Sequence, residues 1–281
     1  MKTLNSTLLA TLSSLLLFAA MPLSAQDAAT PITEEEANAI KRPARSDSPS
    51  LKLIQNYLTA SGGEAAHEAV HNIAASGTHK EVNQLKYFTL IETHKGERHL
   101  TLRWTYRGRE HEEITVFDGV DCWTQVIKPK KEDPKNLGGL QANHFKHQRW
   151  FIHPFTNPLS ARYVFQYQDD ARVGGRPAYL VVGFGPQDER SWFYFDKENF
   201  LVTQYGGIGQ LGGKAGYLDY RATKFKSTDG IFYPSAITLL AKDQTYGEIL
   251  VKELETNIEL DSKLFYKPPS TIPVLRSRNT R

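Results

Sequence analysis

The strict alternation of polar and apolar side chains over residues 99–107 constrains the fold of this chain more than any other feature. A period of two residues is typical of an extended strand with one face toward a core and the other toward water. Arg107-Gly108-Arg109 then indicates a turn, and Asp118-Gly119 ends the next extended segment. We expect a type I′ turn at Asp118-Gly119, because that turn needs positive φ at both central residues. The stretch therefore predicts an antiparallel β-meander.

Short extended segments and turn residues continue through most of the chain, with further hairpin turns expected at Val173-Gly-Gly-Arg176 and Asp229-Gly230. Two helices come first, over 50–60 and from a capping box of Ser61 and Glu64 to near Gly77. Strands are expected over 73–82, 85–94, 98–106, 110–117, 120–127, 161–168, 171–174, 177–185, 190–196, 200–205, 215–227, 231–241 and 245–258. The pattern predicts a mainly β protein with few helices.

The N-terminal residues 1–25 have the features of a secretory signal peptide. Lys2 precedes an apolar run from Leu8 to Ala20, and small residues before the expected cleavage after Ala25 complete the pattern. We expect a flexible leader over 26–49, a single β domain over 50–268 and a disordered tail over 269–281. The mature protein is expected to be soluble outside the cytoplasm.

Composition excludes some classes of partner. The net charge of +3 is too small to indicate binding to nucleic acid. The apolar run in the signal peptide is short for a membrane span, and no second hydrophobic segment approaches that length. Cys122 is the one cysteine, so the chain cannot form an intramolecular disulfide. We expect Cys122 to be an inert buried residue, because it lies mid-strand beside Trp123.

His67-Glu-Ala-Val-His71 matches the H-E-x-x-H pattern of zinc hydrolases. On a helix this spacing places two imidazoles one turn apart and a glutamate, here Glu68, where it can activate metal-bound water. The extended pattern needs Gly at position 74 and His at position 77, but the chain has Ala74 and Gly77. A secreted zinc hydrolase is therefore an alternative function, and the favoured interpretation is a polar helix edge.

Two other motifs favour structure over chemistry. Gly207 to Gly212 matches G-x-G-x-x-G, but the following residues indicate a strand where a dinucleotide site needs a helix. His144, His147 and His153 are close together in sequence without a cysteine or an acidic residue nearby. We expect no metal, no cofactor and no catalytic residue, so the protein is not expected to be an enzyme.

Residues 128–160 interrupt the strands with a loop and then a short helix or lid over 141–156. Aromatic residues are abundant, with 13 Tyr, 14 Phe and 4 Trp, and most lie in expected strands. A β core favours aromatic residues on its own. The functional interpretation is a curved sheet with an apolar hollow under the lid, suited to a lipid. The candidate ligand-binding residues are Trp104, Tyr106, Phe117, Trp123, Trp150, Phe151, Phe155 and Tyr194.

In its organisation over about residues 50–268, the chain resembles the outer-membrane lipoprotein-sorting superfamily that includes LolA and LolB, most of all a secreted branch of it. The motifs that carry the resemblance are, in order, a helix followed by Gly62-Gly63, then Ser76-Gly77-Thr78, Phe117 to Trp123, Val173 to Tyr179, Phe193 to Asp196, Tyr217 to Tyr220, Asp229 to Pro234, and Asn257 to Pro268 with Phe265.

The resemblance implies an unclosed antiparallel barrel of about eleven strands wrapped around short helices, with a hydrophobic cavity for acyl chains and no catalytic site. It implies a periplasmic carrier for a lipid, a lipoprotein acyl chain or another hydrophobic molecule, with a role in transport and outer membrane biogenesis. A third function left open is an envelope protein-interaction module whose concave sheet binds another protein.

Overall fold

The computed structural model describes residues 39–147, 149–156, 162–186, 189–211, 214–241 and 244–270. The predicted signal peptide lies outside these residues, as do 26–38 of the predicted leader and 271–281 of the predicted tail. The last residues of the leader contact the sheet. The backbone N–H of Asp47 donates to Phe165 O (3.1 Å), and the Asp47 carboxylate accepts from the backbone N–H of Tyr167 (3.0 Å).

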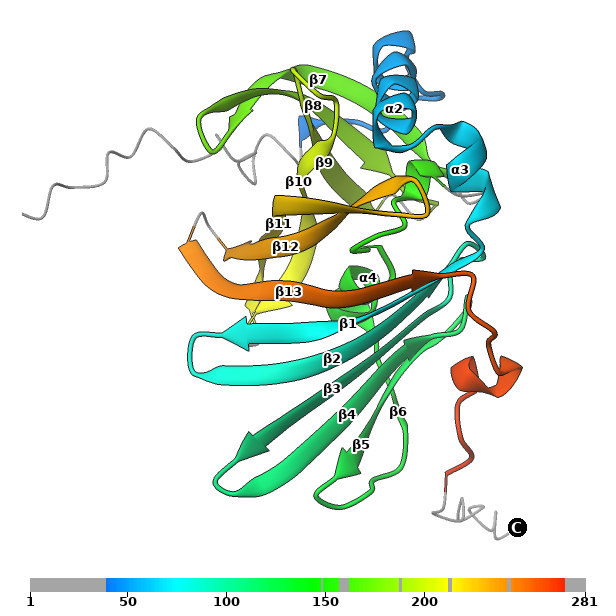
Figure 1. Cartoon of the computed structure of the whole chain (residues 1–281), viewed down its shortest axis with the longest axis vertical. Coiled ribbons are helices and arrows are strands. Elements are labelled where there is room, and N and C mark those ends of the chain that lie inside the picture. The colour runs from blue at the N-terminus through cyan, green and yellow to red at the C-terminus, as the bar shows by residue number, and fades with distance from the viewer. Residues whose placement is uncertain are drawn as a thin grey trace, which may run out of the picture.

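One antiparallel sheet of thirteen strands runs through the described residues in the order β6-β5-β4-β3-β2-β1-β13-β12-β11-β10-β9-β8-β7 (Figure 1). Its strands are β1 (Asn72–Glu81), β2 (Gln84–Thr93), β3 (Arg98–Tyr106), β4 (Arg109–Phe117), β5 (Cys122–Lys128), β6 (Lys135–Asn136), β7 (Val164–Val173), β8 (Arg176–Phe184), β9 (Arg190–Asp196), β10 (Val202–Leu211), β11 (Lys214–Thr228), β12 (Ile231–Ala241) and β13 (Gln244–Thr256). The prediction of an unclosed antiparallel barrel is confirmed, with more strands than the resemblance implied.

Turn chemistry explains where several hairpins form. Arg107-Gly108, Gly174-Gly175 and Asp229-Gly230 all have positive φ at both residues, as type I′ turns require. The prediction of such a turn at Asp118-Gly119 is wrong, because only Gly119 has positive φ there. Instead the Asp118 carboxylate accepts the backbone N–H groups of Val120 (2.8 Å) and Asp121 (2.7 Å). The Asp118 side chain therefore fixes this loop through hydrogen bonds to the backbone of the loop itself.

Two helices precede the sheet. Helix α2 (Ser48–Ser61) is capped by Asp47, whose carboxylate accepts from the backbone N–H of Ser50 (2.8 Å). Helix α3 (Glu64–Ala69) is shorter than expected, and the chain is already in β1 at Asn72. The predicted capping box is wrong, because Gly63 is the N-cap and has no side chain. The Ser61 hydroxyl instead donates to Tyr57 O (2.7 Å) and so belongs to the end of α2.

The sheet has two wings that curl toward each other around the main core. We call β13 with β1–β6 the first wing and β7–β12 the second wing. Helix α4 (Gly139–His147) contacts β10 of the second wing and β5 of the first (Figure 1). The residues after it, 149–156, contain the short helix η1 (Pro154–Thr156) and are buried up to Phe155. We call residues 139–147 and 149–156 the lid, since they span the concave face between the wings.

The two wings are joined through β12 and β13, which pair only from Ala236↔Leu250 to Ala241↔Gln244. Before Ala236, strand β12 pairs with β11, and beyond Leu250, strand β13 pairs with β1. Residues 231–235 of β12 and 251–256 of β13 face each other without pairing, and we call the space between them the seam. At its far end the Thr256 hydroxyl donates to the Asp229 carboxylate.

Substitution of Gly77 should destabilise the first wing. A Cβ at this position of β1 would lie 2.0 Å from Leu250 O and 2.9 Å from the Phe88 ring. We expect Gly77→Ala to lower the free energy of unfolding by about 1–3 kcal/mol, because the backbone of β13 must move. Denaturant unfolding measures this. Gly216→Ala is the matched control, since its Cβ meets nothing within 4 Å, and equal effects of the two variants would contradict the argument.

Candidate functional site

One buried carboxylate fastens the lid to the sheet. The side chain of Glu92, at the end of β2, is fully buried. It accepts the backbone N–H groups of Trp150 (3.0 Å), Phe151 (3.1 Å) and Ile152 (3.0 Å). The carboxylate thereby satisfies three consecutive backbone donors that have no strand beside them. A carboxylate acceptor makes each of these bonds stronger than a neutral one.

Two buried arginines complete this arrangement, which we call the latch. Arg98 Nε lies 3.2 Å from Glu92 Oε1, and its guanidinium donates to Phe145 O (2.9 Å) in α4. Arg149 donates to the carbonyls of Thr93 (3.3 Å) and Gly96 in the β2–β3 turn. Burial lowers the pKa of the Arg149 guanidinium. The latch thus binds the β2–β3 hairpin to both halves of the lid through charge-assisted contacts.

Aromatic rings fill the space beneath the lid. His153 packs edge-on against Tyr205 (4.9 Å between centroids) and Phe193 (5.8 Å). Phe155 packs edge-on against Tyr57 (5.2 Å) and Phe193 (5.1 Å). Edge-to-face contacts at such distances stabilise an apolar core beyond its buried area. The interior is therefore a packed aromatic cluster contributed by α2, β9, β10 and the lid.

Three of the eight candidate ligand-binding residues lie in this interior. Trp150, Phe151 and Phe155 are all buried in the main core. Trp150 packs edge-on against Phe88 of β2 (5.2 Å), and Phe151 packs against Tyr233 of β12 (6.3 Å). The lid thus connects the two wings through its own aromatic side chains.

The other candidates lie elsewhere in the fold. Trp104 stacks on His111 (5.2 Å) near the β3–β4 turn, and Tyr106 beside it is half exposed. Trp123 packs with Val116 and Phe265 in a separate cluster. Tyr194 points away from the main core into a cluster on the opposite face of β9, and Phe117 is half-buried at the edge of the lid. Alternation along β9 places its aromatic residues on opposite faces of the sheet.

The H-E-x-x-H motif does not form the helical arrangement that zinc hydrolases use. Helix α3 ends at Ala69, so His71 lies outside it. His67 is buried and its Nε2 lies 2.8 Å from the Ser61 hydroxyl, whereas Glu68 and His71 are exposed. No group of three or more potential metal ligands occurs in the part of the chain that the structure describes. The expectation of an exposed polar helix edge is also wrong for two of the three residues, because His67 is buried and His71 lies beyond the end of α3; only Glu68 fits it.

The C-terminal end of α4 carries a polar contact that the sequence pattern did not reveal. His147 Nδ1 lies 2.6 Å from the Tyr163 hydroxyl, and its Nε2 lies 3.3 Å from Glu189 Oε1. Burial raises the pKa of Tyr163 to about 12. A phenol with so high a pKa remains protonated at neutral pH and is a poor nucleophile. The trio therefore acts as a tie between α4 and the second wing.

Cys122 is also unsuited to nucleophilic chemistry. It is buried, and burial raises the pKa of its thiol to about 11. The reactive form of cysteine is the thiolate, which is scarce at neutral pH when the pKa is this high.

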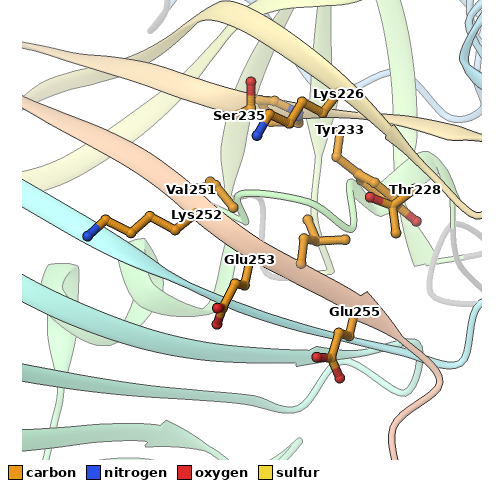
Figure 2. Close-up of a pocket in the computed structure, with 10 residues that line it drawn as sticks. Lys226, Thr228, Tyr233, Ser235, Val251, Lys252, Glu253 and Glu255 are labelled. Atoms are coloured by element: carbon orange, nitrogen blue, oxygen red, sulfur yellow. The ribbon is translucent and has the colours of Figure 1, made fainter.

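Two pockets open beside the lid and the seam. The first, of about 230 Å³, lies where the lid meets the turns of both wings and is lined by Lys95, Phe117, Gly119, Val120, Lys146, His147, Arg149, Arg162, Tyr163, Pro186 and Glu189. The second, of about 300 Å³, lies in the seam between β12 and β13, where Figure 2 shows Tyr233 and Val251. Both of these residues belong to the main core, so the seam pocket reaches the interior.

Replacement of Glu92 should release the lid. Glu92→Gln leaves Arg98 buried without its anionic partner, a change that typically costs about 3–5 kcal/mol of stability. We expect lower stability in denaturant and faster proteolytic cleavage within residues 149–156. Glu110→Gln is the control, because its ion pair with Lys128 is exposed on both sides and should contribute nothing measurable. Equal protease resistance in wild type and Glu92→Gln would contradict the latch.

Acid should destabilise the protein through its buried histidines. Burial lowers the pKa of His153 to about 4 and that of His67 to about 4. The unfolded chain binds protons near pH 6.5 that the folded protein takes up only near pH 4, so the free energy of unfolding falls as pH decreases through this window. At about 1.4 kcal/mol per pKa unit, His153 contributes roughly 3 kcal/mol of that loss.

Unfolding in denaturant at pH 7 and pH 4.5 tests this expectation. His153→Phe should show a smaller loss of stability between the two pH values than wild type. The exposed His71→Gln should show the same loss as wild type. An unchanged pH dependence in His153→Phe would mean that this imidazole is not the neutral buried group we describe.

Comparison with known proteins places the fold. No protein-family profile and no curated protein matches the chain. Among solved structures, a Vibrio parahaemolyticus domain assigned provisionally to outer membrane lipoprotein sorting is similar, with a TM-score of 0.51, 12% identity, and coverage of 78% of this chain and 97% of that one. A LolA superfamily protein from Nitrosomonas europaea gives a TM-score of 0.49 at 12% identity over 78% of this chain and 97% of that one. The likeness to the Vibrio domain shows that the chain has the fold of that lipoprotein-sorting domain, in agreement with the LolA-like fold expected from the sequence.

Proposed function

We propose that the protein binds a hydrophobic ligand, a lipid or the acyl chain of a lipoprotein, between the concave face of the sheet and the lid, and carries it through the periplasm. The observation that carries this proposal is the way in which the lid is held. A segment without strand pairing covers an aromatic interior, and the polar latch around Glu92 fastens it to the first wing.

The latch favours a cover that opens as a unit. Three backbone contacts of the lid depend on one carboxylate, so displacement of that carboxylate would break all three together. When the Glu92 contacts break, Trp150, Phe151 and Phe155 leave the interior together, since they lie on one short segment. Their departure would expose Phe88, Phe193 and Tyr233, an apolar surface suited to an acyl chain.

One further group supports a site in this interior. The Tyr205 hydroxyl is buried beside His153 and has no hydrogen-bond partner among the described residues. An unsatisfied buried hydroxyl costs stability unless another molecule provides its partner. A polar atom of a ligand, for example an ester carbonyl, is a suitable partner.

The proposed periplasmic location depends on the signal peptide expected over residues 1–25. In the described part of the chain, none of the helices has the length and apolar character needed to cross a membrane.

Two other functions have less support. The geometry around His67 and His71 in the described residues opposes a zinc hydrolase. An envelope protein-interaction module would bind another protein on the concave sheet, which the buried residues 149–155 of the lid cover. Native mass spectrometry of the secreted form, isolated gently, separates these cases. Recovery of a protein partner without a bound hydrophobic molecule would favour the interaction module.

Binding of the uncharged probe N-phenylnaphthylamine tests the proposal. We expect saturable fluorescence enhancement with wild type, and an association rate that rises at least about tenfold in Glu92→Gln, because each 1.4 kcal/mol removed from lid closure increases the open population tenfold and the lost latch contacts contribute more than that. Stopped-flow fluorescence measures both.

Two variants act as controls for this experiment. Arg98→Lys keeps the charge but loses the guanidinium geometry, so it should accelerate association less and remain folded. Glu110→Gln should leave the rate unchanged. Absence of saturable binding would refute the proposal, and an association rate that does not respond to the folded latch variants would show that the ligand does not enter beneath the lid.

A further inference from the structure

The pocket where the lid meets the turns of both wings has an excess of positive charge. Four cationic side chains line it, and one carboxylate, Glu189, opposes them, so with histidine neutral its net charge is 4 − 1 = +3. The cationic residues are Lys95, Lys146, Arg149 and Arg162. The chain as a whole carries only +3 over 281 residues, so this concentration is local.

Three of these cations are available to a ligand. Lys95 and Arg162 are exposed, and neither forms an ion pair in the part of the chain that the structure describes. Lys146 lies over the Phe117 ring (5.0 Å) and makes a long contact with Val120 O (3.5 Å). Arg149 is different, because its guanidinium already donates to two carbonyls in the latch. Glu189 is occupied by His147.

The pocket also lies beside the proposed ligand site. Arg149 lines the pocket, while the next residue, Trp150, packs against Phe88 in the main core. Phe117 and Tyr163 give the pocket an aromatic wall next to its cations. An amphiphile that extended from Arg149 to Trp150 would place its charged end among these cations and its chain beneath the lid.

We propose that this pocket binds a phosphate-bearing head group, so that the ligand of the protein is an anionic phospholipid-type amphiphile. This inference rests on the function proposed above. A phosphate monoester carries about −1.5 to −2 charges at pH 7, which matches several convergent cations better than a single carboxylate does. Arginine and lysine both bind phosphate oxygens well, the first through its planar fork and the second as a point charge.

A pair of single-chain amphiphiles tests the inference. One has a phosphate monoester head group, the other is a monoacylglycerol with the same acyl chain, and inorganic phosphate is the third ligand. Isothermal titration calorimetry should show the phosphate amphiphile binding at least about tenfold more tightly than the neutral one, the scale of one hydrogen bond to a charged group. Raising the salt concentration should weaken only the phosphate amphiphile.

Surface charge variants separate the pocket from general electrostatics. The double variant Lys146→Gln with Arg162→Gln should bind the phosphate amphiphile no more tightly than the neutral one, with the neutral affinity unchanged. Lys226→Gln with Lys252→Gln removes two cations from the seam pocket and should leave the preference intact. The four side chains that these two double variants replace are exposed or half-buried, so we expect both variants to fold. Circular dichroism measures this.

Each outcome decides between the two proposals. Equal affinity for the two amphiphiles would overturn the phosphate site and leave the hydrophobic carrier standing. Binding of inorganic phosphate, lost in Lys146→Gln with Arg162→Gln, without binding of either amphiphile would support the anion pocket and refute the carrier. No binding of any of the three ligands would overturn both. A preference that persists in the double variant would show that the pocket is not its source.

Discussion

The carboxylate of Glu92 organises the interior of this protein. Backbone N–H groups in a buried segment need partners, and residues 150–152 have no neighbouring strand to provide them. A single side chain at the end of β2 satisfies all three. Its own charge is balanced by Arg98, which in turn reaches the carbonyl of Phe145 in α4. The lid is therefore bound to the first wing by one connected set of charged groups, while His147 ties it to the second wing.

This form of closure differs from the packing around it. The interior under the lid consists of aromatic contacts that are numerous, individually weak and tolerant of small shifts. The latch is the opposite, because it consists of few contacts that depend strongly on geometry and on exclusion of water. Such a combination fits the proposed opening, in which the lid separates from the sheet along one defined surface. The cationic pocket lies directly at the edge of that surface, since Arg149 belongs to both.

Much of the fold follows from local sequence patterns. The boundaries expected for β3, β9 and β12 coincide with those of the observed strands. Polarity alternation defines β3, and the Asp229-Gly230 turn defines the start of β12. Other features depend on competition between neighbours. Ser61 has the spacing of a capping residue, but Gly63 with positive φ begins α3, and Ser61 bonds to α2. Asp118 has the dipeptide of a tight turn, but its carboxylate binds two backbone groups of its own loop.

The candidate site was harder to predict than the fold. The lid and its aromatic residues Trp150, Phe151 and Phe155 are visible in the sequence as an interruption of the strand pattern. Glu92 is not, because a glutamate at the end of a strand is usually exposed. The one local signal is that Glu92 pairs with Arg98 across the β2–β3 hairpin. Its burial depends on a segment almost 60 residues later in the chain, as the separation of 58 from Trp150 shows, and no local pattern contains that information.

The seam has a mechanical consequence for a sheet of this size. Adjacent strands are rotated by roughly 20–25° relative to each other, and strongly twisted open sheets rarely exceed about ten strands without curling or splitting. Here the ladder between β12 and β13 ends at Ala236↔Leu250, so the accumulated twist is released at one place. Within the sheet, the two wings are consequently joined only by the short β12–β13 ladder, so a change in the angle between them would bend that hairpin and leave the hydrogen bonds within each wing intact.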